Sequence, residues 1–241
     1  MPPPEEPSLS VKLSLSPSAY SFSNPAPPVL ALTIESHANR PLTLFTWNTP
    51  FHPRSGLTNA CFLIIDTADN TPIPQSTIRI QRGPLSRMRG SGDEKYFLTL
   101  YPHTPTVVST GFTRGGTVPP QPRAIVERGW ELDERGNEQK IRRSTRACGA
   151  DGLEGGHRYK VGVARGGLMG VWWRWGVREE MLVDRESLDW NLSGLEPEQV
   201  PLKVGEIEWV EFSVDDWSVY MFVAFLWVRL VSNIRGKKVA P

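Results

Sequence analysis

Cysteine is scarce in this chain of 241 residues, which contains only Cys61 and Cys148. Cys61 lies in the apolar run CFLII, where a thiol is typical of a small core residue, and Cys148 lies in a polar, glycine-rich segment. A disulfide between them is therefore disfavoured. The N-terminal stretch MPPPEEP also lacks the apolar centre of a signal peptide. Both absences predict a cytoplasmic protein with reduced thiols.

The chain also lacks an excess of charge of either sign. Its 27 Lys and Arg residues balance 26 Asp and Glu residues, which gives a net charge of +1. This balance provides no field that would attract nucleic acid or an anionic membrane. We therefore expect no nucleic-acid partner.

Long hydrophobic runs are absent, with one partial exception near the C-terminus. The run WSVYMFVAFLWVRLV at 217–231 is interrupted by Ser218, Tyr220 and Arg229, and it is shorter than the about 20 apolar residues that span a bilayer. We interpret it as a buried terminal strand or helix and expect no stable membrane insertion. Two alternatives are a weak peripheral membrane contact through 217–241, aided by the basic tail RGKK, and an extension that comes from an incorrect gene model.

Catalytic and ligand-binding motifs are missing as well. The sequence has no HExxH, CxxC, GxSxG, GxGxxG or GxxxxGK[ST] pattern, so zinc, serine-hydrolase and phosphate-binding motifs give no support for an activity. The four histidines, His37, His52, His103 and His157, are dispersed, and we predict that His52 and His103 are exposed residues of proline-bounded loops. These absences predict no metal site and no cofactor, and they favour a protein that is not an enzyme.

The sequence does contain a repeated alternation of apolar and polar residues with a period of two. The expected strands are bounded by turn-forming residues, in keeping with 22 prolines and 21 glycines. The strands are expected at 9–15, 29–36, 42–47, 61–66, 76–82, 95–101, 106–112, 158–163, 170–177 and 205–214. Short strands at this spacing predict an all-β sandwich or barrel. A change of parity within the last strand predicts a β-bulge at Trp209–Val210.

Segments without this alternation divide the chain. Residues 1–8 are expected to be a disordered N-terminus, and residues 9–216 to be one β-sandwich domain. Residues 113–150 have few apolar side chains and mixed charges, which predicts a disordered, flexible insertion in that domain. Residues 217–241 form an apolar and basic C-terminal extension.

The stretch DGLEGGHRYKVGV at 151–163 says most about the fold. A leucine, a glycine-containing turn and a tyrosine followed by alternating valines match the tyrosine corner of Greek-key sandwiches. We expect Leu153 to fill the core at the turn. We expect the Tyr159 hydroxyl to bond backward to the backbone of the connection.

With these strands in place, residues 9–178 resemble an immunoglobulin-like or fibronectin-III-like Greek-key β-sandwich. The opening strand rich in Leu and Ser and the closing strand WWRWG are similar to those of a group of uncharacterised fungal proteins. The opening strands are also similar in layout to the small, non-catalytic sandwich that accompanies fungal deuterolysin-type metallopeptidases. Because HExxH is absent, the resemblance implies a fold and no activity.

The stretch VWWRWGV poses a choice between core and binding surface. Alternation places Trp173 and Trp175 on the apolar face of a strand, so we assign both to the core. Trp172 and Arg174 then face outward, where a ring beside a guanidinium can stack on a sugar, a base or an aromatic side chain of a partner. The alternative is that the C-terminal run or Trp190 covers Trp172.

These features favour a non-catalytic intracellular module that binds a protein or a small molecule, with Trp172 and Arg174 as candidate contacts. The alternative is an enzyme or binding protein for an apolar small molecule that uses a pocket between the two sheets. A third, weaker interpretation is carbohydrate binding by Trp172 and Trp47, which an intracellular location disfavours.

Overall fold

The computed structural model describes the strands and most of their connections. The described residues are 6–21, 26–75, 77, 83–113, 128, 130–132, 135–140, 149–150, 152–185, 187, 190–192, 195–198 and 200–215. The strand expected at 76–82, apart from Thr77, and the extension at 217–241 lie outside the described residues. Within the described residues, no helix is long and apolar enough to cross a membrane.

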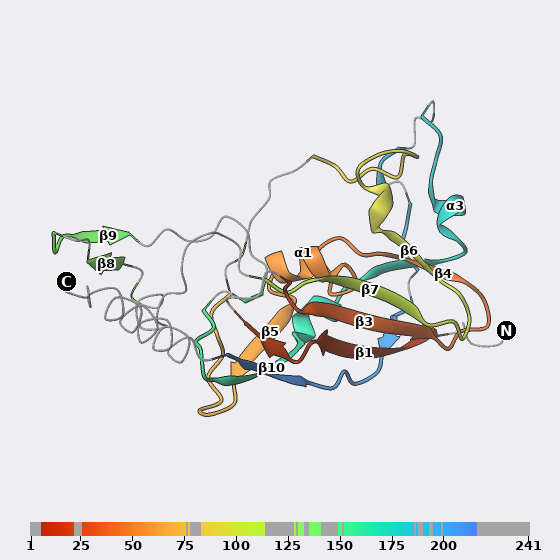
Figure 1. Ribbon diagram of the computed structural model, residues 1–241. Helices are drawn as coiled ribbons and strands as arrows, with labels where there is room; N and C mark the ends of the chain where they lie inside the picture. The colour runs from red at the N-terminus through yellow and green to blue at the C-terminus, as the bar shows by residue number, and fades with distance from the viewer. Residues whose placement is uncertain are drawn as a thin grey trace, which may run out of the picture.

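Two four-stranded sheets make up most of the fold, consistent with the all-β sandwich that the sequence predicts. The first sheet contains, in spatial order, β12 (Lys203–Val204), β1 (Ser8–Ser16), β3 (Val29–Ser36) and β7 (Thr106–Gly111). The second contains β2 (Ala19–Tyr20), β13 (Val210–Val214), β10 (Arg158–Val163) and β5 (Phe62–Asp66). Figure 1 shows β1, β3 and β7 running side by side along the length of the molecule.

A third sheet contains β11 (Trp172–Trp175), β4 (Leu42–Phe45) and β6 (Phe97–Leu100). In this sheet β4 pairs antiparallel with β11, just as β5 pairs antiparallel with β10 in the second sheet. In both pairs, one strand comes from the segment 42–66 and the other from the segment 158–175. Helix α1 (Pro53–Thr58) separates β4 from β5, and the 3₁₀ helix η2 (Arg165–Leu168) separates β10 from β11. These insertions divide one long antiparallel pairing into two, so β5 and β10 lie toward one end of the molecule and β4 and β6 toward the other (Figure 1).

The main core lies between the first sheet and the other two. Alternate residues of β1 are buried, as the period of two predicts: Leu9, Val11, Leu13 and Leu15. They belong to one apolar cluster with β3 residues such as Leu32 and with side chains of the second sheet such as Phe212. Burying a leucine, isoleucine or phenylalanine side chain contributes roughly 1.5–3 kcal/mol, so this cluster holds the sheets together.

A second, smaller cluster covers the other face of β4 and β11. Its buried members are Phe45, Tyr96, Phe97, Met181, Leu182 and Leu192. Two short elements contribute to it, the 3₁₀ helix η1 (Glu94–Tyr96) and helix α3 (Arg178–Met181). Both faces of this sheet are therefore packed, which explains why all four residues of β4 are buried.

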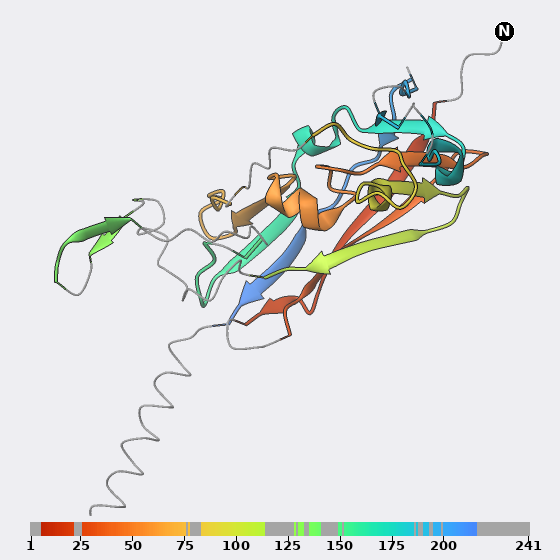
Figure 2. The ribbon, with the colours of Figure 1, turned by 90° about the horizontal axis from the view of Figure 1, so that it is seen from above.

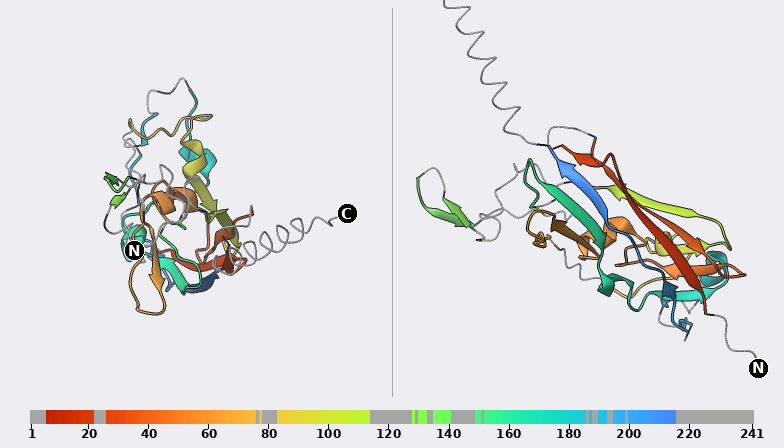
Figure 3. Two further views of the ribbon diagram at one scale, coloured as in Figure 1. Left: turned by 60° about the vertical axis from the view of Figure 1, so that its left-hand side comes forward. Right: turned by 90° about the horizontal axis from the view of Figure 1, so that it is seen from below.

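The N-terminal and C-terminal strands both change sheets along one side of the sandwich. β1 pairs with β12 in parallel in the first sheet, and β2 pairs with β13 in parallel in the second. Figure 3 shows β13, in blue, beside the red N-terminal strands. Residues 205–209 carry the chain across and belong to no strand. The parity change that suggested a bulge at Trp209–Val210 therefore comes from this crossing.

The insertion at 113–150 leaves and rejoins the sandwich at neighbouring points. Thr113 bridges Gly149, and the Ala150 N–H donates to the Thr113 carbonyl at 3.0 Å. Its described residues include a hairpin of β8 (Trp130–Leu132) and β9 (Glu138–Lys140), which differs from the expected lack of structure. Figure 2 shows this hairpin apart from the other strands, and it pairs with none of them.

Candidate functional site

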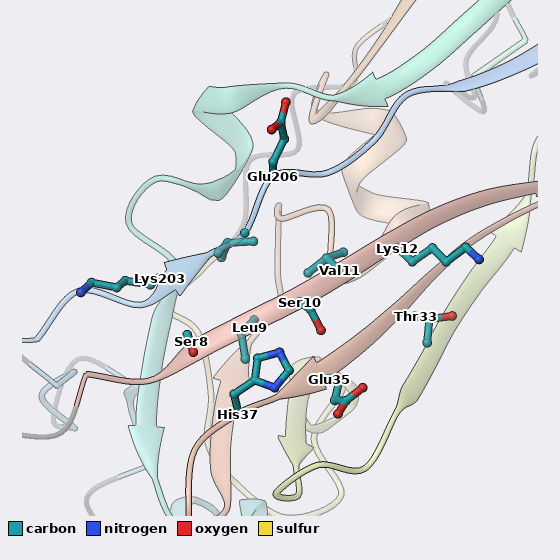
Figure 4. A pocket seen from close by; sticks show the side chains of 12 residues that line it. Ser8, Leu9, Ser10, Val11, Lys12, Thr33, Glu35, His37, Lys203 and Glu206 are labelled. Atoms are coloured by element: carbon teal, nitrogen blue, oxygen red, sulfur yellow. The ribbon is translucent and has the colours of Figure 1, made fainter.

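A groove of about 590 Å³ lies on the first sheet, where β12 leaves β1. Side chains on the outer face of the sheet line it, including Ser10 and Lys12 of β1 and Thr33 and Glu35 of β3. Figure 4 shows Glu35 and His37 on one side of β1, and Lys203 and Glu206 on the other. The groove therefore spans three strands, and it lies outside the sandwich core.

The groove begins where residues 205–209 leave the first sheet and cross toward the second. The Lys203 N–H donates to the Pro7 carbonyl and the Gly205 N–H to the Leu9 carbonyl, at 3.0 and 2.9 Å. The pairing of β12 with β1 then ends, and the next residue of β1 on this edge, Val11, has no described strand beside it. Val11 and Gly205 both line the groove.

The groove carries charges of both signs. Lys12, Lys203 and Glu206 are exposed, and Glu35 is half-buried. Lys203 makes an ion pair with Glu6, which precedes β1. A site with this composition suits a polar, zwitterionic chain better than an apolar small molecule, which favours enclosed pockets with few polar groups.

Two of the histidines that look dispersed in the sequence meet at one end of the groove. Potential metal-ligand atoms of Glu35, His37 and His103 all lie within 4.8 Å of one another. Glu35 and His37 are two apart on β3 and its C-terminal end, so they point to the same face of the sheet. His103 comes from the turn between β6 and β7. The E-x-H spacing at the end of an expected strand was the signal available in the sequence.

Backbone contacts hold the His103 turn against the end of β3. The His103 N–H donates to the Ser36 carbonyl at 2.8 Å, and Ser36 bridges Pro102. His103 has a φ of 52°, in the left-handed region that is uncommon for residues other than glycine. The two imidazole rings are tilted, with centroids 6.1 Å apart. Ser36 is fully buried, so the residue between Glu35 and His37 anchors the group to the core.

The structure places the predicted contact pair of Trp172 and Arg174 beside the second cluster. Trp172 is half-buried, its ring packs edge-to-face on Phe97 with centroids 6.2 Å apart, and its indole N–H donates to the Leu195 carbonyl at 3.3 Å. An Arg174 guanidinium N–H donates to the Glu196 carbonyl at 3.1 Å. Leu195 and Glu196 therefore cover part of this face.

Trp47 packs on the same second cluster, with its ring 4.7 Å from that of Tyr96. It is half-buried, like Trp172. On the opposite face of β11, Trp173 is 2 % exposed and donates its indole N–H to the Val200 carbonyl at 3.0 Å. Trp175 is half-buried, packs edge-to-face on Trp173, and has the Arg40 guanidinium 4.1 Å above its ring.

The two residues that the sequence assigns to a tyrosine corner both lie in the core. Leu153 and Tyr159 are each 1 % exposed. The Tyr159 hydroxyl accepts a hydrogen bond from the Glu154 N–H at 2.9 Å, so it bonds backward to the connection. Beside it, His157 Nδ1 lies 2.9 Å from a carboxylate oxygen of the buried Asp66. This group lies at the turn before β10, in the second sheet, whereas the groove lies on the first sheet.

Comparison of the chain with protein-family models and with curated proteins found no match.

Proposed function

We propose that this protein is a non-catalytic cytoplasmic interaction module that binds a short polar segment of a partner protein in the groove over β1. One observation carries the proposal. The groove lies on the outer face of a sheet, at an edge of β1 where the pairing with β12 has ended, and side chains of both charges line it. An extended peptide carries backbone hydrogen-bonding groups and alternating side chains, which match such a surface.

One exposed apolar side chain next to the groove also favours a protein partner. Val107 of β7 is 63 % exposed, and it is paired in register with Thr33, which lines the groove. Val107 thus offers an apolar contact at the margin of the groove, and interfaces commonly combine such contacts with a polar rim. The alternative of an apolar ligand between the sheets is less well supported, because this groove lies outside them.

An immunoglobulin-like fold is part of the same proposal. The grouping of β1, β3 and β7 in one sheet and of β5, β10 and β13 in the other is the arrangement of strands A, B, E and C, F, G in such sandwiches. The backward hydrogen bond of Tyr159 also supports it. Modules of this class function largely through surfaces presented by a rigid sandwich. The buried, free Cys61 thiol is in keeping with a reducing compartment.

A matched pair of substitutions on one sheet tests the groove. Ser10 and Ser109 are both exposed on the outer face of the first sheet, but Ser10 lines the groove and Ser109 lies two strands away on β7. Ser10→Trp should fill the groove without disturbing the core, and Ser109→Trp should add the same bulk elsewhere. The unfolding midpoints of both variants should stay close to that of the parent.

The probe is a phage-displayed library of random peptides, selected against the full chain. Selected peptides should shift the backbone amide signals of Val11, Thr33 and Gly205 in NMR spectra. They should bind Ser10→Trp at least about tenfold more weakly than the parent, a loss of roughly 1.4 kcal/mol, and Ser109→Trp equally well. The proposal fails if the peptides shift another surface or do not distinguish the two variants.

A further inference from the structure

Glu35 and His37, which line the groove, and His103 beside them form a set of potential metal-ligand groups. Among the described residues, the Glu35 carboxylate and the ring nitrogens of His37 and His103 make no hydrogen bond or ion pair, while their ligand atoms lie within 4.8 Å of one another. Three groups that can each supply a metal-ligand atom are thus brought together from two chain segments.

We propose that Glu35, His37 and His103 bind a first-row transition-metal dication such as Zn²⁺. Two imidazole nitrogens and one carboxylate oxygen are a common donor set for such ions, and they leave further coordination positions open. Imidazole is a poor ligand for Mg²⁺ and Ca²⁺, which prefer oxygen donors. This inference does not depend on peptide binding in the groove.

The geometry allows the ligands to close on an ion with small movements. Zinc–nitrogen bonds of about 2.0–2.1 Å in a tetrahedral site place two donor atoms about 3.3 Å apart. The present separations of up to 4.8 Å therefore need side-chain rotations only. Both histidines are exposed and are free to rotate, while their backbones are fixed by the hydrogen bond from His103 to Ser36.

The open coordination positions have access to solvent through the groove. Glu35 and His37 line the groove, so water or a donor atom of a bound molecule can reach an ion held between them. Lys12, which also lines the groove, pairs with Thr33 in the strand register and lies one outward position from Glu35 along the sheet. Its positive charge lowers the affinity for a dication, so replacing it should strengthen binding.

The experiment is a Zn²⁺ titration of the untagged full chain carrying Cys148→Ser, which removes a thiol outside the described residues. The chain has four histidines, so the imidazole rings give four Cε1–Hε1 correlations in NMR spectra. Stoichiometric Zn²⁺ should shift the signals of His37 and His103 together and leave those of His52 and His157 unchanged. Calorimetry of the same sample should show one site, and Mg²⁺ should cause no shift.

Substitutions identify the ligands. His37→Ala, His103→Ala and Glu35→Gln should each weaken Zn²⁺ binding at least about tenfold, which is the smallest loss expected even for groups that only orient a ligand. His157→Ala is the matched control, because it removes a histidine that contacts Asp66 at 2.9 Å away from the groove. Lys12→Ala should bind Zn²⁺ more tightly than the parent. All the groove variants alter outward-facing side chains and should keep the parent's circular dichroism.

Three results would overturn the inference. One is the absence of heat and ring shifts at millimolar Zn²⁺. Another is a shift confined to a single histidine, which would mean adventitious binding. The third is equal Zn²⁺ affinity in the parent, His103→Ala and Glu35→Gln, which would show that the two chain segments do not share an ion.

Discussion

Two adjacent tryptophans on β11 should differ in how much each contributes to stability. Trp173 is 2 % exposed in the main core, whereas Trp172 is half-buried against the second cluster. A tryptophan covers roughly 150–250 Å², and at about 25 cal/mol per Å² complete burial contributes about 4–6 kcal/mol. Trp173→Ala should therefore cost about 3–5 kcal/mol, the usual range for a core aromatic. Trp172→Ala should cost about 2 kcal/mol, because its ring keeps part of its exposure.

Each alanine substitution also removes an indole hydrogen bond, which adds to the stability lost by Trp173→Ala and by Trp172→Ala. Trp173 donates to the Val200 carbonyl at 3.0 Å and Trp172 to the Leu195 carbonyl at 3.3 Å. Replacement by phenylalanine separates this part, since Trp173→Phe removes the N–H but keeps most of the apolar contact. It should cost about 1–2 kcal/mol, close to the loss of one buried hydrogen bond.

Urea unfolding followed by far-ultraviolet circular dichroism measures these differences, because the other tryptophans complicate fluorescence. The free energies of unfolding of Trp172→Ala and Trp173→Ala should differ by more than about 1 kcal/mol, beyond the usual error of extrapolation. Equal losses would refute the reasoning, since they would mean that both faces of β11 are equally buried. A loss near zero for Trp172→Ala would mean that the second cluster does not cover its ring.

Four further outcomes follow from the described contacts. Tyr159→Phe should cost about 1–2 kcal/mol, because the Glu154 N–H loses its acceptor; an unchanged urea midpoint would contradict this. Burial, together with the Lys95 ammonium, lowers the pKa of His52. The unfolded chain therefore takes up this proton first, and stability should fall as the pH drops below about 6.5; His52→Asn keeps a side-chain cap for α1 and should reduce that slope. Burial raises the pKa of the Cys61 thiol, so in Cys148→Ser iodoacetamide should modify the native chain at pH 8 far more slowly than the unfolded chain. Replacing 114–148 with a short Gly–Ser linker should change the unfolding free energy by less than about 1 kcal/mol, because Thr113 and Gly149 are already adjacent; a larger loss would show that the insertion supports the sandwich.

The predictable part of the fold is the part governed by local alternation. The expected strand at 9–15 matches β1, and the one at 158–163 matches β10. Residues of β1 alternate between core and surface as their polarity requires. Tyr159 was also predictable, since its hydrogen bond reaches only five residues back along the chain. Local pattern was sufficient in these cases because each residue either bonds to a residue close in sequence or only has to be buried in the core.

The candidate site depends on contacts between distant segments, and alternation carries no information about those. His37 and His103 are adjacent because the turn after β6 bonds to Ser36, and this requires knowing which strands are neighbours. Burial of Trp172 is a similar case. Its outward direction on β11 was predictable, but the cover comes from Phe97 and Leu195, which precede and follow it by many residues.

The groove itself arises from a feature that the sequence shows but does not explain. Glu206 and Glu208 have the parity that Val210 then takes up, and within one strand such a change requires a bulge. A chain that crosses between sheets gives the same signal, because each sheet buries its own set of alternate residues. Val210 pairs with Val161 in the second sheet, whereas Val204 pairs with Leu9 in the first. The crossing leaves the edge of β1 at Val11 without a described strand beside it, so the parity change marks where the groove begins.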